Sequence, residues 1–178
     1  MESQKSDLEG LRSGVDSQGK TREFRRPMGF LIRRIQESDL DEILSIENVS
    51  FPSPWSRWAF QSEIHAPHAY PFVLVDGGAP RVLGYLCSWI ILDECHLLNL
   101  AVHPECRRMG AASKMIDNLL RFCRAKEVER FYLEVRMSNE HAITLYQKFG
   151  FHVCGVRRGY YSDTGEDAFI MLRGTSCL

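Results

Sequence analysis

The pattern of hydrophobic and polar positions changes its period several times between residues 30 and 172 of the 178-residue chain. Short apolar runs that end at turn residues are typical of β-strands, and apolar residues spaced three and four apart are typical of amphipathic helices. This pattern predicts strands at residues 30–35, 72–75, 82–91, 95–102, 130–136, 151–158 and 168–172. It predicts helices at residues 38–47, 56–65, 112–123 and 139–148.

Turn and capping residues agree with these assignments. We expect Ser38 and Ser56 to cap the first two helices, because a serine hydroxyl accepts a hydrogen bond from a free backbone N–H of the first turn. Asp76-Gly77-Gly78 predicts a hairpin, and Gly150 predicts the end of the last helix. The order of elements therefore predicts an α/β fold of the α+β kind, a central mixed sheet of about seven strands with helices on both faces.

The first part of the chain differs from the rest. Residues 1–27 are polar and show neither a helical nor a strand period. Such a segment cannot bury enough apolar surface to offset the entropy lost on ordering. We therefore expect residues 1–27 to form a disordered tail and residues 28–178 to form one domain, which is large enough to bury a substantial core.

Charge and cysteine usage narrow the function classes. The formal net charge is −1, whereas a nucleic-acid-binding domain is usually clearly basic. No apolar run is long enough to cross a membrane and no secretory signal opens the chain, so we expect a cytoplasmic protein without a membrane or nucleic-acid partner. The six cysteines form no C-x-x-C pair and have no histidines at metal-ligand spacing, which favours free thiols and no metal site.

The stretch from Leu97 to Ser113 contains a candidate ligand site. Residues 97–102 are apolar except for Asn99, which predicts a buried strand, and a small-residue turn at residues 110–112 leads directly into a helical pattern. A strand, a tight turn and a helix in this order direct backbone N–H groups and the positive end of the helix toward one point, where a pyrophosphate fits. The alternative is a surface turn with two solvated arginines.

Residues 107–112, RRMGAA, fit the pattern Gln/Arg-x-x-Gly-x-Gly/Ala and resemble the acyl-CoA loop of the GCN5-related N-acetyltransferases. The predicted order of elements over residues 28–174 is also similar to that of the N-acetyltransferase fold. The resemblance implies that the chain uses acetyl-CoA as its cosubstrate and needs no metal. The cofactor-binding residues that it implies are Leu100, Ala101, Val102, Arg107, Arg108, Met109, Gly110, Ala111, Ala112, Ser113 and Asn139.

A longer set of motifs narrows the resemblance. The motif LEVR-x-SN-x5-LY-x2-FGF runs from Leu133 to Phe151, and the motifs YY and GEDA follow at residues 160–161 and 165–168. Together they resemble the RimI-type ribosomal-protein alanine N-acetyltransferases. The resemblance implies an enzyme that acetylates the N-terminal alanine of a small-subunit ribosomal protein, with that protein's N-terminus as its partner.

Glu134 is the candidate general base. A terminal α-amine has a pKa of about 7.7–8.0 and is mostly protonated at neutral pH, so a base has to remove a proton before the amine can attack a thioester. In the predicted strand, alternation places Phe131, Leu133 and Val135 on one face and Glu134 on the other. A solvated or ion-paired glutamate is the alternative; the resemblance favours the base, because this family has its base at the matching position.

Tyr146 is the candidate general acid. Ala142, Leu145, Tyr146 and Phe149 form a helical stripe of the kind that usually packs into a core. The two roles are compatible, because the ring can pack while the hydroxyl reaches the sulfur of the thioester. The resemblance implies that this hydroxyl protonates the departing thiolate.

Five further residues complete the candidate site. Asn139 can be a helix cap alone, although the matching residue of the family also contacts the cofactor. Tyr160 and Tyr161 can be ordinary strand aromatics or can cover a bound peptide. Glu166 and Asp167 can form a solvated turn or can attract a basic protein N-terminus.

Two other function classes stay open at this stage. The first is an acetyltransferase for lysine side chains or small amines; lysine, with a pKa of about 10.4, needs more help in losing its proton than an α-amine does. The second is a non-catalytic acyl-CoA-binding module, which would keep the loop and lack the base or the acid. Both Glu134 and Tyr146 are present, which disfavours the module.

Overall fold

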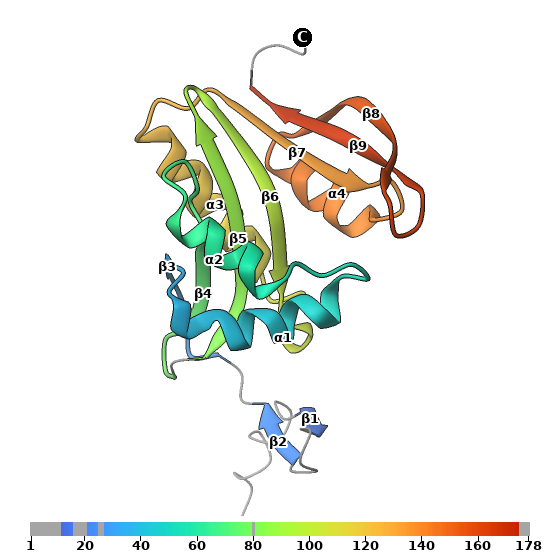
Figure 1. Ribbon diagram of the computed structural model, residues 1–178. Helices are drawn as coiled ribbons and strands as arrows, with labels where there is room; N and C mark the ends of the chain where they lie inside the picture. Colours follow the sequence, from blue (N-terminus) through green and yellow to red (C-terminus); the bar gives the residue numbers. More distant parts are fainter. Residues whose placement is uncertain (1–11, 16–20, 25–26, 80, 175–178) are drawn as a thin grey trace, which may run out of the picture.

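A seven-stranded mixed sheet forms the centre of the computed structural model, which describes residues 12–15, 21–24, 27–79 and 81–174 (Figure 1). The strands lie in the order β3-β4-β5-β6-β7-β9-β8. Their bounds are β3 Phe30–Arg34, β4 Phe72–Asp76, β5 Val82–Ile91, β6 Glu94–Val102, β7 Arg130–Arg136, β8 His152–Tyr161 and β9 Glu166–Arg173. Neighbouring strands are antiparallel except β6 and β7, which are parallel. The predicted mixed sheet is confirmed.

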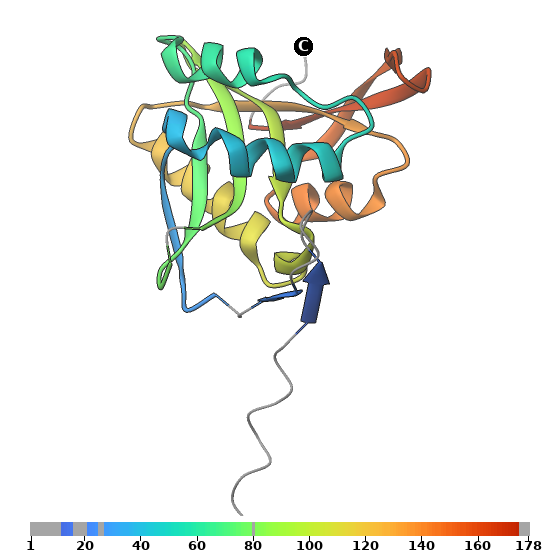
Figure 2. The same ribbon diagram turned by 60° about the horizontal axis from the view of Figure 1, so that its bottom comes forward.

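Helices cover both faces of this sheet, as predicted (Figure 2). On one face lie α1 (Leu40–Ser50) and α2 (Arg57–His65), and on the other lie α3 (Ala111–Arg124) and α4 (Glu140–Lys148). Each face has its own hydrophobic core. The first includes Ile43, Phe60 and Tyr85, and the second includes Met115, Leu119 and Tyr146.

The start of the first helix differs from the prediction. Ser38 does not cap it but lies inside a short 3-10 helix, Glu37–Asp39, that leads into α1. The Asp39 carboxylate, which is almost fully buried, accepts hydrogen bonds from the backbone N–H of Gln36 and from the Arg33 guanidinium. This ionic contact with β3 organises the turn in place of the serine hydroxyl. Ser56 does cap α2, since its hydroxyl accepts from the backbone N–H of Ala59 at 3.2 Å.

The parallel pair in the middle of the sheet separates along its length. Residues Glu94 to Leu97 of β6 pair with Arg130 to Leu133 of β7, and no later residues of the two strands are paired. Beyond that point β6 stays with β5 as far as Val102, and β7 stays with β9 as far as Arg136. The register on β5 passes from Leu97 to Asn99, so Leu98 forms a bulge where the separation begins. Figure 1 shows β6 and β7 diverging from this point.

The last hairpin is longer than predicted. β8 extends to Tyr161 and β9 begins at Glu166, so both tyrosines lie on a strand, and the turn of residues 162–165 follows directly. The register between the strands shifts between Arg157 and Tyr161, and Gly159 adopts a positive φ of 58° within this irregular segment. The irregular segment changes the course of β8 immediately before the two tyrosines.

The expected tail lies mostly outside the described residues. The described part of this segment contains two short antiparallel strands, β1 (Arg12–Val15) and β2 (Thr21–Phe24), where the sequence pattern predicted no element. Cys177 also lies outside the described residues, while Cys87, Cys95, Cys106 and Cys123 are free thiols. Among the helices of the described segments, none combines the length and the apolar character needed to cross a bilayer.

Candidate active site

A cavity of about 650 Å³ opens where β6 and β7 separate. Five segments that lie far apart in the sequence surround it. They are the end of α1 with the loop that follows, Leu97 to Leu100 of β6, Glu134 to Arg136 of β7, one side of α4 with the residues just before it, and the β8–β9 hairpin. The strands can form two walls of one cavity because their paired neighbours lie on opposite sides, β5 beside β6 and β9 beside β7.

The cavity brings together seven of the candidate residues named from the sequence. Its lining includes Leu100, Glu134, Asn139, Tyr146, Tyr160, Tyr161 and Glu166. The other predicted residues lie elsewhere. Ala101 and Val102 are buried at the end of β6, and residues 107–113 form the loop that follows and the first turn of α3. The predicted residues therefore fall into a cavity and an adjoining loop.

Glu134 lies on the β7 wall. Phe131, Leu133 and Val135 are buried on the opposite face of the strand, as the alternation predicted, and Glu134 is half-buried at the cavity. Its Oε1 accepts a hydrogen bond from Nη1 of Arg157 at 2.8 Å, so the carboxylate is ion-paired rather than simply solvated. A carboxylate in this position can accept a proton from an amine in the cavity.

Tyr146 lies on the α4 wall and is 8% exposed. Its ring packs edge-on against Phe151 with centroids 5.8 Å apart, so the residue belongs to the core and to the cavity at once. Burial raises the pKa of the Tyr146 hydroxyl well above its ordinary value, and the nearby Tyr161 adds to the shift. The hydroxyl therefore stays protonated at neutral pH and can serve as a proton donor.

Asn139 caps α4 and also borders the cavity. Its Oδ1 accepts a hydrogen bond from the backbone N–H of Ala142 at 3.1 Å, which satisfies one of the free donors of the first turn. Capping uses the side-chain oxygen, and the amide nitrogen is the group that could contact a ligand.

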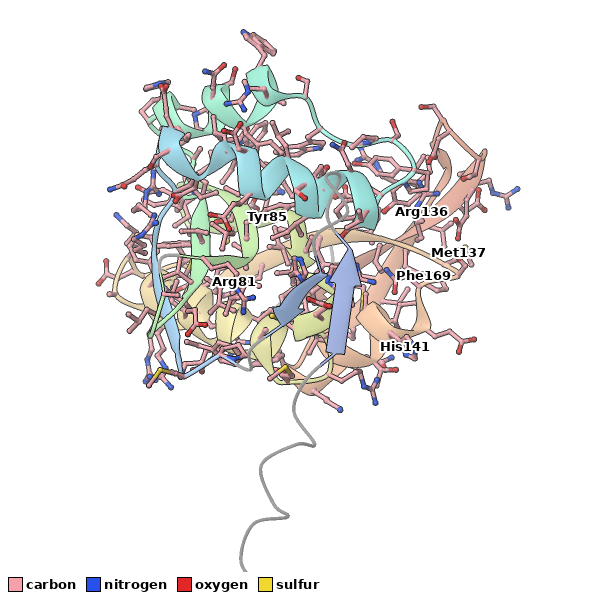
Figure 3. All side chains as sticks on the ribbon, turned by 90° about the horizontal axis from the view of Figure 1, so that it is seen from below. Arg81, Tyr85, Arg136, Met137, His141 and Phe169 are labelled. Atoms are coloured by element: carbon pink, nitrogen blue, oxygen red, sulfur yellow. The ribbon has the colours of Figure 1, made fainter. Side chains whose placement is uncertain are left out.

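The acidic residues of the last hairpin hold the hairpin itself in place. The Arg136 guanidinium donates to Asp163 at 2.6 Å, to Thr164 at 2.8 Å and to Glu166 at 3.2 Å (Arg136 is labelled in Figure 3). Glu166 also accepts from the backbone N–H of Ser138 at 2.9 Å. Asp167 accepts from the backbone N–H of Gly159 at 2.8 Å. Glu166 and Asp167 thus accept hydrogen bonds within the protein rather than forming a solvated turn, and Glu166 also lines the cavity.

The same contacts place the two tyrosines over the cavity. The Arg136 guanidinium carbon lies 3.8 Å from the centroid of the Tyr161 ring, and the rings of Tyr160 and Tyr161 meet edge to face at 5.1 Å. Burial raises the pKa of Tyr161 to about 12, although the Arg136 charge partly opposes the shift. Two protonated phenols at the cavity are suited to contacting a peptide backbone.

Glu47 is a residue of the cavity that the sequence analysis missed. It is 1% exposed and accepts hydrogen bonds from the Trp55 backbone N–H at 2.7 Å, from the Asn99 amide at 3.3 Å and from the Tyr85 hydroxyl. Burial raises the pKa of its carboxyl. The signal was its position on the apolar stripe of the first helix, where a charged residue needs partners. Through Trp55, Glu47 fixes the loop that lies opposite β7.

The loop before α3 has the geometry expected of an anion site. Arg108 and Gly110 have positive φ values of 64° and 83°, and Gly110 is the N-cap of α3. The N–H groups of the first turn have no acceptors within the helix. A Cβ at Gly110 would meet no atom within 4 Å, so the approach to the turn is open. This loop could hold the pyrophosphate of a coenzyme.

The Arg107 side chain is not simply solvated. Its Nε donates to the Val102 carbonyl at 3.1 Å and its Nη2 donates to the Ser50 hydroxyl at 3.1 Å. These bonds tie the loop to the end of β6 and to the end of α1. Within the described segments, no group of three or more His, Cys, Asp or Glu side chains could hold a metal ion.

Comparisons with known proteins agree with this geometry. The chain matches the model of the Acetyltransferase (GNAT) family over residues 40–151. It is 37% identical over 141 residues to a Bacillus subtilis protein named as a candidate ribosomal protein bS18-alanine N-acetyltransferase, covering 79% of this chain and 92% of that protein. It is 32% identical over 165 residues to an N-alpha-acetyltransferase of Sulfurisphaera tokodaii, covering 84% and 95%.

A solved structure extends the similarity to three dimensions. The fold matches the crystal structure of the ribosomal-protein-S18-alanine N-acetyltransferase from Escherichia coli with a TM-score of 0.75 and 32% identity. The match covers 84% of this chain and 96% of that one. The similarity therefore includes almost the entire length of that protein.

Proposed function

The chain belongs to the acetyltransferase (GNAT) family, and from this premise we propose that it transfers the acetyl group of acetyl-CoA to the N-terminal alanine of ribosomal protein bS18. The observation that carries this proposal is the cavity between β6 and β7, which has a carboxylate on one wall and a protonated phenol on another. The names of the similar proteins support the choice of substrate.

The reaction needs three proton transfers. The amine nitrogen attacks the thioester carbonyl carbon, the C–N bond forms and the C–S bond breaks. Glu134 accepts the proton that the α-ammonium must lose before it attacks, directly or through a water molecule. Tyr146 gives its proton to the departing thiolate, and the second proton that the nitrogen loses as the amide forms restores the Tyr146 phenol. Glu134 and Tyr146 lie on a strand and on the following helix, so they can approach the reacting centre from different sides.

The raised pKa of Tyr146 does not prevent this second transfer. From ordinary values of about 10 for tyrosine and about 8.5 for a thiol, the transfer is uphill by about 2 kcal/mol. Burial raises the pKa of Tyr146, and the same cavity also disfavours a thiolate anion, so the two acids shift in the same direction. A positioned site has to overcome the difference that remains.

The adjoining loop supplies the cosubstrate site of the proposal. Backbone N–H groups of residues 108–113 and the N-terminus of α3 would hold the pyrophosphate of acetyl-CoA. Arg107 would hold the loop against β6 and α1, and Asn139 would reach the cofactor from α4. Leu100, Ala101 and Val102 would lead from the loop toward the cavity. We place the reaction in the cytoplasm, where ribosomal proteins are made, without nucleic acid or membrane as a partner.

The test of the proposed function is where the acetyl group goes. The protein is incubated with acetyl-CoA and two peptides of identical sequence that begin with alanine and contain lysine, one with a free and one with a blocked α-amine. We expect mass spectrometry to find the acetyl group on the α-amine of the first peptide and none on the second. Transfer to lysine in the blocked peptide would contradict the proposal and favour a lysine acetyltransferase.

A further inference from the structure

The general base of the proposed reaction has a partner of its own. Nη1 of Arg157, on β8, donates to Oε1 of Glu134, on β7, at 2.8 Å, although strand β9 lies between them. Glu134 lines the cavity, whereas Arg157 is not part of the lining. The guanidinium therefore approaches the carboxylate from outside the cavity and engages one of its two oxygens.

The register of the strands explains how Arg157 reaches across β9. Ala168 of β9 lies opposite Arg157 on one side and opposite Arg136 on the other. Residues opposite one another point to the same face, and Glu134 lies two residues before Arg136 on that face. The single methyl group of Ala168 leaves the long Arg157 side chain room to pass diagonally to Glu134. The ring of Tyr160 borders this path, 5.2 Å from the guanidinium carbon.

The ion pair has little to contribute to folding. The Arg157 side chain is 53% exposed and the Glu134 side chain is 28% exposed. A pair with this exposure is screened by water and contributes little to the free energy of unfolding. The ion pair matters more for turnover than for folding, because it fixes the position of the carboxylate. A catalytic group misplaced by about 1 Å can cost about 100-fold in rate.

We propose that Arg157 is a positioning residue for Glu134. It holds one carboxylate oxygen from the β8 side, so that the other oxygen is presented to the amine in the cavity. This inference rests on the proposed function, because it takes Glu134 as the base. Arg157 does not compete with the amine for this oxygen, because it lies outside the cavity lining.

The test is a double-mutant cycle on turnover. Wild type, Arg157→Gln, Glu134→Gln and the double variant are compared at saturating acetyl-CoA and saturating peptide, and thermal unfolding is measured for each. Arg158→Gln is the matched control, because it removes the same charge from the neighbouring exposed residue of β8. In the wild-type background we expect Arg157→Gln to lower kcat about 10- to 100-fold, with the KM for acetyl-CoA within about twofold.

The double variant separates positioning from a structural role. If Arg157 acts through Glu134, its replacement should change kcat by less than about twofold in the Glu134→Gln background. An equal loss in both backgrounds, or unchanged or faster turnover of Arg157→Gln alone, would overturn the inference. Near-normal turnover of Glu134→Gln alone would instead overturn the proposed base, so the two failures are distinguishable.

Discussion

At the scale of single residues, the site differs from a surface of solvated charges because each charged group has a defined partner. Arg136 binds three side chains of the last hairpin, and Glu47 accepts from a helix-to-helix loop, a strand tyrosine and a strand asparagine. A buried carboxylate without such donors would cost stability, so Glu47 can be buried only where they converge. The polar residues thus fix the walls of the cavity before a substrate enters.

The proposed division of labour between Glu134 and Tyr146 gives a prediction about pH. Glu134→Gln keeps the shape of the side chain and removes the proton acceptor, so turnover at neutral pH should fall by about 10²–10⁴-fold. Raising the pH to about 9 provides more of the neutral amine, whose pKa is about 7.7–8.0, and should partly restore this variant. Tyr146→Phe removes only the hydroxyl; its turnover should also fall, and the higher pH should not restore it, since the missing group serves the sulfur.

The raised pKa of Tyr146 sets the range in which this comparison is valid. The folded protein retains the phenolic proton above the ordinary pKa of 10, where the unfolded chain begins to lose it. The associated stability is therefore fully present below pH 10 and is lost only as the pH rises toward the folded value. Profiles of kcat between pH 6 and about 9.5 should thus report on chemistry, and unfolding curves of Tyr146→Phe should stay close to wild type. If high pH restored the turnover of Glu134→Gln and Tyr146→Phe equally, the assignment of Glu134 to the amine and of Tyr146 to the sulfur would be contradicted.

At the scale of elements, the loop before α3 yields a prediction about the cosubstrate. A valine at Gly110 would have a β-branched side chain at a φ of 83°. Nothing lies within 4 Å of the Cβ position, so the penalty is conformational, and the loop should relax away from its present shape. We expect Gly110→Val to weaken acetyl-CoA binding severely in calorimetry while the protein stays folded.

Gly165→Val is the matched control for that experiment. Gly165 also has a positive φ, 71°, and open space at its Cβ position, but it lies in the turn between β8 and β9. Gly165→Val should therefore lose similar stability and keep its affinity for acetyl-CoA. Unchanged affinity in Gly110→Val would show that the pyrophosphate binds elsewhere.

The elements were predictable from the sequence because their apolar residues follow a period that burial enforces. The seven strands and four main helices of the domain occur where the pattern predicts them, and the capping serine of α2 does as well. The serine predicted to cap α1 was wrong, because the Asp39 carboxylate, bonded to Arg33 on β3 and to the backbone N–H of Gln36, organises that turn. Capping preferences compare single residues and do not report an ionic contact between a strand and the turn that follows it.

The same limit applies to the candidate site. Glu134, Tyr146, Tyr160 and Tyr161 could be selected from their motifs, and the structure places them around one cavity. The contact of Arg157 with Glu134 could not be predicted, because it depends on the register of β8 on β9 and of β9 on β7. The alternation of residues within β8 or within β7 does not reveal how these two strands are aligned through β9, which lies between them.

At the scale of the whole molecule, the cavity results from how the two halves of the sheet are paired. β6 belongs to a group with β3, β4 and β5, and β7 belongs to a group with β8 and β9. The groups share only the short parallel ladder that ends at Leu97 and Leu133. The loop proposed for the cosubstrate follows the first group and the proposed base lies in the second, so the proposed reaction takes place where the halves separate.

This arrangement predicts that residues 1–27 are dispensable for catalysis. The described part of the domain begins with contacts of its own: the Met28 backbone nitrogen donates to Asp76 at 3.0 Å, and the Gly29 carbonyl accepts from Gly77 at 3.0 Å. A chain that starts at Met28 keeps these bonds, because its terminal ammonium replaces the amide beside the Asp76 carboxylate. All the residues that line the cavity follow this point. We expect the shortened chain to keep kcat and both KM values within about twofold and to unfold at a similar temperature. A loss of turnover above about tenfold in a chain that still unfolds cooperatively would mean that the N-terminal segment contributes directly to the site.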